Sequence, residues 1–173
     1  VWRRDTPSPV ILNGADGSIF SGSPYTRWDG HEPLRLVTHH WGGNWMKGFD
    51  IYETLDNLLA DSEWKKRIEF TYIGNLPKDF SFANARYLQP MQGEALAREL
   101  SSHHVYVTAS MNEPAGMHHI EGAMCGLPLL YRRSGALPEY CDGFGIEFVG
   151  ADFVSALQRM MEEYESHADQ MAN

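Results

Sequence analysis

From residue 34 onward, short apolar runs alternate with segments whose apolar residues recur at helical spacing. The runs occupy 34–40, 69–74, 85–90, 104–110 and 127–131, and helical spacing is found at 49–59, 95–100 and 117–125. The runs are apolar on both faces, which is typical of parallel strands that crossover helices cover from both sides. The alternation therefore predicts an α/β fold built on a doubly wound, Rossmann-like parallel sheet, followed by an amphipathic terminal helix after Asp152.

The length of 173 residues predicts a single globular domain. Residues 1–32 are rich in Gly, Pro, Ser and Asp and contain one short apolar run at 10–12, so we expect them to form a lead-in segment. Residues 33–173 are expected to form the domain, since no internal repeat or low-complexity linker divides them.

The charge balance restricts the partners of the chain. Fourteen basic and 23 acidic residues give a net charge of −9, which disfavours binding to a nucleic-acid backbone or an anionic membrane surface. A small anionic ligand is compatible with this balance, because a few local cations and a helix N-terminus can hold a diphosphate.

Cys125 and Cys141 match no zinc or redox spacing, and we expect both to be reduced thiols of a cytoplasmic protein. No stretch approaches the ~20 apolar residues of a membrane span. The first residues lack the apolar region of a signal peptide, and we expect residue 1 to lie inside a longer protein.

Histidine doublets at 39–40, 103–104 and 118–119 suggest a metal site at first sight. Adjacent strand residues point to opposite faces, however, and the doublets lack a ligand spacing such as His-x3-His. We therefore expect no bound metal.

Ligands of an open parallel sheet bind outside the carboxyl ends of the strands, so the loops after the strands are the candidate site. The loop 39–48 contains three glycines, Asn44 and Lys47. Glycines allow the backbone to approach an anion closely, and Lys47 supplies a positive charge. The alternative is a flexible connection with a solvated lysine, because the loop matches no Walker A or dinucleotide fingerprint.

The loop that leads into the helix at 117–125 is the most informative stretch. Backbone amides at Gly116 and Met117, where this helix begins, are expected to face an anionic ligand. Seven residues separate Glu113 from Glu121, and these carboxylates suit the hydroxyl groups of a sugar and a ribose better than a phosphate. The alternative is an acid at a helix N-terminus plus a surface glutamate.

Two further loops contain candidates. The amides of Ser134 and Gly135, after the run at 127–131, are expected to complete a phosphate pocket, unless the loop is a plain turn. The loop QPMQG around Met91 has no chargeable group, which suits a nucleobase or a packing contact.

Together these loops resemble the C-terminal domain of family 4 glycosyltransferases of the GT-B fold. The resemblance runs from VILNGAD to the terminal helix, and its most specific part is the E-x7-E element from Glu113 to Glu121, followed by the strand entry GLP. The sequence SGALPE at 134–139 also fits. The resemblance implies the nucleotide-sugar-binding, C-terminal half of a GT-B fold, with residues 1–32 leading in from the interdomain linker.

The resemblance also implies a reaction: transfer of a hexose-type sugar from a nucleoside-diphosphate sugar, with retention of anomeric configuration and without a metal or other cofactor. Charge that develops on the leaving group would be met by Lys47 and the helix N-terminus. Glu113 would lie near the transferred sugar, Glu121 at the ribose and Met91 near the base. The implied catalytic residues are Glu113 and Lys47, and the implied donor-binding residues are Glu121, Gly116, Met117, Asn44, His40, Ser134, Gly135 and Met91.

The chain departs from the family where members carry Gly-Arg shortly before the loop lysine. Here the sequence is HWGGN at 40–44, without an arginine. We expect His40 or Asn44 to replace the lost diphosphate contact, with Arg132 or Arg133 as a further source of charge.

The acceptor, a glycan or a lipid-linked molecule, is expected to bind a separate N-terminal domain outside these residues, so the domain alone would be weakly active or inactive. We expect a role in bacterial surface polysaccharide synthesis, in the cytoplasm or at the cytoplasmic face of the inner membrane, with peripheral membrane association of the full-length enzyme. Two alternatives are a nucleotide-sugar epimerase of the same fold and a non-catalytic nucleotide-binding module. The E-x7-E element and Lys47 favour the transferase.

Overall fold

The computed structural model describes residues 12–21 and 25–172. Its strands form one parallel sheet in the order β3-β2-β1-β4-β5-β6. The strands are β1 (Leu34–His40), β2 (Ile68–Gly74), β3 (Arg86–Leu88), β4 (Val105–Thr108), β5 (Leu129–Arg132) and β6 (Gly145–Phe148). This is the order of a doubly wound sheet in which the direction of winding reverses between β1 and β4.

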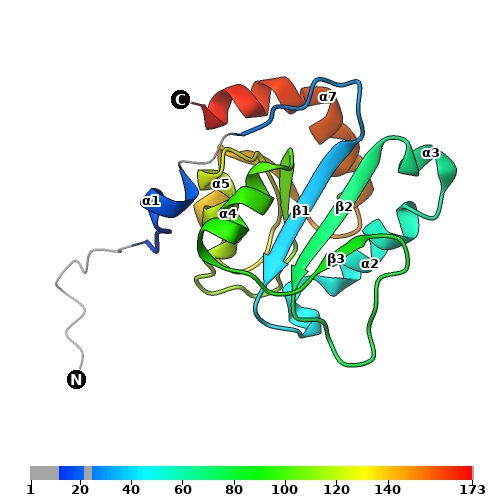
Figure 1. The fold of residues 1–173 in the computed structure, drawn as a ribbon, viewed down its shortest axis with the longest axis horizontal. Helices are drawn as coiled ribbons and strands as arrows, with labels where there is room; N and C mark the ends of the chain where they lie inside the picture. Colours follow the sequence, from blue (N-terminus) through cyan, green and yellow to red (C-terminus); the bar gives the residue numbers. More distant parts are fainter. Residues whose placement is uncertain (1–11, 22–24, 173) are drawn as a thin grey trace.

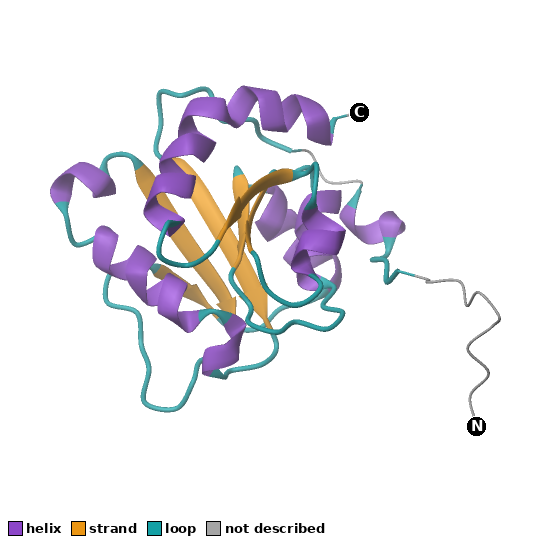
Figure 2. Ribbon diagram, turned by 180° about the vertical axis from the view of Figure 1, so that it is seen from behind, coloured by secondary structure: helices purple, strands orange, loops and turns teal. Residues whose placement is uncertain are grey.

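Helices cover both faces of the sheet, as Figures 1 and 2 show. They are α1 (Gly17–Phe20), the 3-10 helix η1 (Trp45–Lys47), α2 (Phe49–Leu58), α3 (Ser62–Lys65), α4 (Gly93–Ser101), α5 (His118–Met124), α6 (Leu137–Cys141) and α7 (Phe153–Met171). The predicted doubly wound α/β sheet is therefore confirmed.

Each face of the sheet has its own hydrophobic core, because successive strand residues point to opposite sides. Leu36 of β1 belongs to the core that contains Phe49 of α2 and Leu157 of α7. Val37, the next residue, belongs to the core that contains Leu96 of α4 and Tyr106 of β4. All of these side chains are buried, which explains why the strands are apolar on both faces.

The described residues before β1 pack on the domain. Phe20 of α1 is buried in the same core as Leu96, and the indole of Trp28 meets the ring of Tyr164 in α7 edge to face at 5.5 Å. The apolar run predicted at 10–12 lies outside the described residues except for Leu12. The predicted boundary between a lead-in segment and the domain at residue 33 stays a prediction. In the structure, α1 and the segment 25–32 pack against the domain through Phe20 and Trp28.

Cys125 and Cys141 are free, buried thiols. In the described part of the chain, no helix has both the length and the apolarity that crossing a membrane requires.

Candidate functional site

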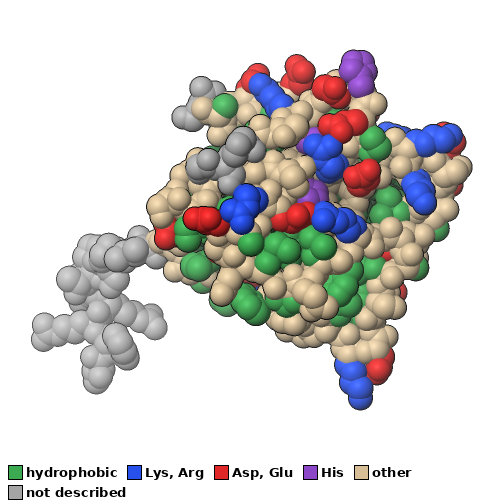
Figure 3. All heavy atoms as spheres, viewed as in Figure 1, with side chains coloured by type: hydrophobic (Ala, Val, Ile, Leu, Met, Phe, Trp, Pro, Cys, Tyr) green, Lys and Arg blue, Asp and Glu red, His purple; other side chains and the backbone are tan. Residues whose placement is uncertain are grey.

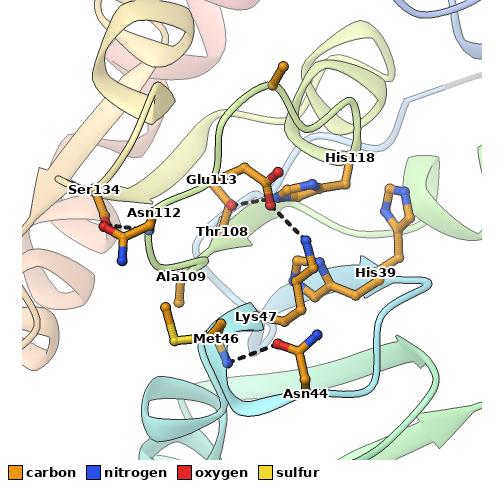
Figure 4. A network of polar contacts seen from close by, with 12 residues as sticks. His39, Asn44, Met46, Lys47, Thr108, Ala109, Asn112, Glu113, His118 and Ser134 are labelled. Atoms are coloured by element: carbon orange, nitrogen blue, oxygen red, sulfur yellow. Dashed lines mark hydrogen bonds and ion pairs between the residues drawn. The ribbon is translucent and has the colours of Figure 1, made fainter.

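Two loops meet at the carboxyl ends of β1 and β4, where the winding of the sheet reverses. Lys47 ends η1 in the loop after β1, and Glu113 lies in the loop after β4. The Nζ of Lys47 is 2.8 Å from Oε2 of Glu113, and Figure 4 shows the two side chains pointing toward one another. The two residues that the family resemblance assigns to catalysis thus form an ion pair at the switch point, the usual ligand position in such sheets.

The loop that carries Lys47 is fixed at both ends. Oδ1 of Asn44 accepts a hydrogen bond from the N–H of Met46 at 3.1 Å and caps η1 (Figure 4). The carbonyl of Met46 accepts from the N–H of Met111 at 2.7 Å, which ties this loop to the one after β4. Gly48 has a φ of 96°, and a Cβ there would lie 2.4 Å from the Cβ of Ala109. The close approach of the two loops therefore depends on this glycine.

The loop that carries Glu113 is supported by the loop after β5. Oγ of Ser134 accepts a hydrogen bond from the N–H of Asn112 at 2.8 Å (Figure 4). The carbonyl of Glu113 accepts from the N–H of Ala136 at 2.8 Å. Gly135 lies so close that a Cβ there would be 2.3 Å from the carbonyl oxygen of Glu113. Ser134 and Gly135, which the sequence predicts to line a phosphate pocket, thus hold the Glu113 loop in place.

A cavity of about 420 Å³ opens beside the ion pair. This volume lies in the range of about 300–1,000 Å³ that is usual for small-molecule sites. Of the predicted site residues, those lining the cavity are His40, Lys47, Met91, Gly116, Met117 and Glu121. Trp41 and Met117 are exposed at its edge. In Figure 3, hydrophobic side chains gather on the lower part of the molecule, toward the carboxyl ends of β1 and β2.

Positive charge in the cavity comes from Lys47, which is the only Lys or Arg among its described lining residues. His40 is buried with its Nε2 2.7 Å from Oη of Tyr52, and burial lowers the pKa of His40 well below its usual value. It lines the cavity as a neutral group, so it does not replace the charge of the family's arginine.

The other expected substitutes for that arginine are already engaged. The side chain of Asn44 caps η1. Arg132 pairs with Asp50, and Arg133 pairs with Glu147. None of these residues therefore provides a second positive charge in the cavity, and the electrostatic attraction for a diphosphate there comes from Lys47.

Buried histidines surround the floor of the site. Nε2 of His118 is 2.8 Å from Oγ1 of Thr108, and the rings of His118 and His40 lie 4.6 Å apart (Figure 4 shows His118 and Thr108). Burial lowers the pKa of His118 well below its usual value and lowers that of His119 to about 4. These imidazoles are neutral at physiological pH. In the part of the chain that the structure describes, no group of three or more His, Cys, Asp or Glu side chains is arranged to hold a metal ion.

The free energy of unfolding is expected to fall as the pH decreases from about 6.5 to about 4. A histidine titrates near about 6.5 when unfolded, so in this window the unfolded chain binds more protons than the folded one. Stability therefore rises with pH there, by up to about 1.4 kcal/mol per pH unit for each such histidine. Urea denaturation across this window measures the slope. His119→Gln is expected to make the dependence of the unfolding free energy on pH shallower. His31→Gln, at an exposed position, is the control and is expected to leave the slope unchanged. Equal slopes for the two variants would show that buried His119 does not cause the pH dependence.

His39 is not predicted as a site residue, because in the sequence it stands out only as one half of a histidine doublet. The structure places its Nε2 2.7 Å from Oε2 of Glu121. Residues 37 and 39 of a strand share one face, and Val37 packs in the core under α4 and α5. Strict alternation along β1 would have placed His39 on the same side of the sheet as Glu121.

No protein-family profile matches the sequence, and no curated protein matches it. Solved structures do match. The α,α-trehalose 6-phosphate synthase from Burkholderia multivorans matches with a TM-score of 0.63 and 10% identity, over 83% of this chain and 38% of that one. WaaG, a glycosyltransferase involved in lipopolysaccharide biosynthesis, matches with a TM-score of 0.65 and 12% identity, over 82% of this chain and 41% of that one.

A third match is a trehalose-6-phosphate structure from E. coli bound with UDP-2-fluoro glucose, with a TM-score of 0.64 and 11% identity, over 83% of this chain and 40% of that one. The chain therefore spans about two fifths of the length of these proteins (38–41%). At such low identity the likeness establishes the fold. This chain has a Rossmann-like α/β fold that matches structures of GT-B glycosyltransferases.

Proposed function

We propose that the chain is the donor-binding domain of a retaining, metal-independent glycosyltransferase that uses a nucleoside-diphosphate sugar. The observation that supports this most is the Lys47–Glu113 ion pair at the β1/β4 switch point, beside a cavity that Glu121 also lines. A cation for the diphosphate and two carboxylates for hydroxyl groups are the groups that such a donor requires.

Each group has a distinct role in the proposed reaction. Lys47 binds the diphosphate and stabilises the negative charge that grows on it as the bond to the sugar breaks. Glu113 then exchanges its ammonium partner for a hydroxyl of the transferred sugar. Glu121 accepts a hydrogen bond from the ribose, the base lies near Met91, and the amides of Gly116 and Met117 lie beside the diphosphate.

The acceptor is proposed to be a glycan or lipid-linked molecule, bound by a domain outside this chain, in bacterial surface polysaccharide synthesis. One matching structure is a lipopolysaccharide glycosyltransferase, which supports this setting. The proposed place is the cytoplasm or the cytoplasmic membrane face, reached by peripheral association.

Calorimetric titration with UDP, GDP and ADP, each with and without EDTA, tests this function. Binding of one diphosphate that EDTA does not weaken would support it and would identify the base of the donor. Absence of binding to all three at millimolar concentration would contradict it. Binding without sugar transfer in the full-length protein would favour a non-catalytic module, and epimerisation of the bound sugar would favour the epimerase.

Glu121→Ala is expected to weaken binding of the nucleoside diphosphate by about 1.5–3 kcal/mol, since a hydrogen bond to a charged acceptor is lost. Glu94→Ala is the control, because its side chain on α4 is 77% exposed. Equal affinities of the two variants would exclude Glu121 from the ribose site.

A further inference from the structure

A chain of hydrogen bonds leads from the core of the domain to Glu121. Tyr106 of β4 is fully buried, and its Oη lies 3.0 Å from Nδ1 of His39. The backbone N–H of His39 donates to the same Oη at 3.2 Å. On the other side of the imidazole, Nε2 lies 2.7 Å from Oε2 of Glu121. One carboxylate oxygen of Glu121 is therefore held by a side chain that is itself anchored in the core.

The direction of each hydrogen bond follows from the chemistry of the three groups. Burial raises the pKa of Tyr106 well above its usual value, so its phenol keeps its proton. The carboxylate of Glu121 accepts from Nε2 of His39, and in a neutral imidazole Nδ1 then accepts from the phenol. An imidazole that accepts at Nδ1 carries its proton on Nε2 and donates it to a carboxylate. Tyr106 and Glu121 thus favour the same tautomer of His39, the one with the proton on Nε2.

The helix that carries Glu121 lies on the same tyrosine. A Cβ at Gly122 would come within 2.4 Å of Cδ2 in the ring of Tyr106, so α5 approaches the ring as closely as a glycine allows. The rings of His39 and Tyr106 also pack edge to face, with centroids 5.6 Å apart. One buried ring therefore positions both the histidine and the helix that bears its partner.

The pair is nevertheless accessible to a ligand. The side chains of His39 and Glu121 are 9% and 17% exposed, and both line the cavity that Lys47 also lines. Because Oε2 is bonded to His39, the rotamer of Glu121 is restricted and Oε1 remains as an acceptor for a hydroxyl group. A pre-oriented acceptor loses less side-chain entropy on binding than a free one.

We infer that His39, oriented by Tyr106, is a positioning residue that holds Glu121 in the conformation that receives the ribose, and that this pair selects ribonucleotides over deoxyribonucleotides. The inference rests on the proposed function, because it concerns the ribose of the same donor. It assigns a role in the ribose site to His39, which lies outside the E-x7-E element.

The test compares UDP, GDP and ADP with their 2′-deoxy and 3′-deoxy analogues on the wild-type chain, His39→Ala and His39→Gln. Compared with the wild-type chain, His39→Ala is expected to bind the ribonucleotide about five- to tenfold more weakly. For one of the two deoxy analogues, the affinity of His39→Ala is expected to lie within about twofold of the wild-type affinity. Glutamine places an N–H at a similar reach and is expected to restore ribonucleotide affinity to within about threefold of wild type. A general loss of structure would weaken every nucleotide alike, so the selective loss is the diagnostic readout.

A second measurement does not depend on the nucleotide. Long-range ¹H–¹⁵N correlations of the imidazole are expected to show the Nε2–H tautomer of His39 in the wild type and a changed tautomer population in Tyr106→Phe. The Nδ1–H tautomer in the wild type would overturn the inference.

The outcomes separate the inference from the proposed function. Nucleotide binding with the same ribo-to-deoxy ratio in wild type and His39→Ala would overturn the role of His39 alone. No binding of any nucleotide by the wild type would overturn the proposed function and the ribose role of His39 with it.

Discussion

Replacement of Lys47 by alanine is expected to lower the affinity for a nucleoside diphosphate by about a hundredfold or more, and to leave the affinity for the matching nucleoside within about twofold. Lys47 is the only Lys or Arg among the described residues that line the cavity. Its removal deletes the cation that attracts the diphosphate. It also leaves the carboxylate of Glu113, which is 7% exposed, without its partner beside an anionic ligand.

Calorimetry on the nucleoside and the nucleoside diphosphate separates the charge effect from a general loss of the site. Lys47→Arg keeps a cation and is expected to retain more of the diphosphate affinity than Lys47→Ala. Lys78→Ala, at an exposed lysine of the loop after β2, is the control for net charge. Equal losses for nucleoside and nucleoside diphosphate in Lys47→Ala would show that this lysine does not contact the phosphates.

Gly48→Ala is expected to lower the free energy of unfolding by about 4 kcal/mol or more. The residue has a φ of 96°, which an L-residue rarely adopts, and its Cβ would lie 2.5 Å from the backbone carbonyl carbon of Ala109. The backbone of Ala109, the first residue after β4, cannot rotate away as a side chain does, so the loops after β1 and β4 must separate. Diphosphate affinity is expected to fall as well, because Lys47 is the adjacent residue.

Gly143→Ala is a matched control for this substitution. Gly143 has a φ of 83°, but a Cβ there would meet nothing within 4 Å. The free energy of unfolding of Gly143→Ala is expected to fall by only about 1–2 kcal/mol, the cost of the left-handed backbone conformation for an L-residue. Urea denaturation of both variants measures the difference, and similar losses would show that the contact with Ala109 does not determine the stability.

The elements that frame the site could be predicted from the sequence because each has a strong local signal. The apolar run at 34–40 is β1, the helical spacing after Phe49 is α2, and the terminal stripe is α7. Lys47 and Glu113 follow β1 and β4, and parallel strands place such loops at one edge of the sheet. Their proximity therefore follows from topology.

Other features depend on contacts between distant residues and leave no local signal. The strand β6 (Gly145–Phe148) is short, and α1 lies in a segment whose composition indicates a loop. The small residues of the loop predict that the amides of Ser134 and Gly135 complete a phosphate pocket, but their hydrogen bonding and packing against the Glu113 loop are visible only in three dimensions. The neutral state of His40 likewise results from burial against Tyr52, which no spacing reveals.

The ion pair between Lys47 and Glu113 means that the site contains its own counter-ion. An incoming anion must compete with Glu113 for Lys47, and a bare phosphate or pyrophosphate offers the displaced carboxylate only repulsion. A ligand that joins a diphosphate to a hydroxyl-bearing sugar satisfies both partners at once, because the carboxylate then receives a hydroxyl in exchange for the ammonium. Such an exchange of partners would favour an intact sugar nucleotide over inorganic phosphate or pyrophosphate.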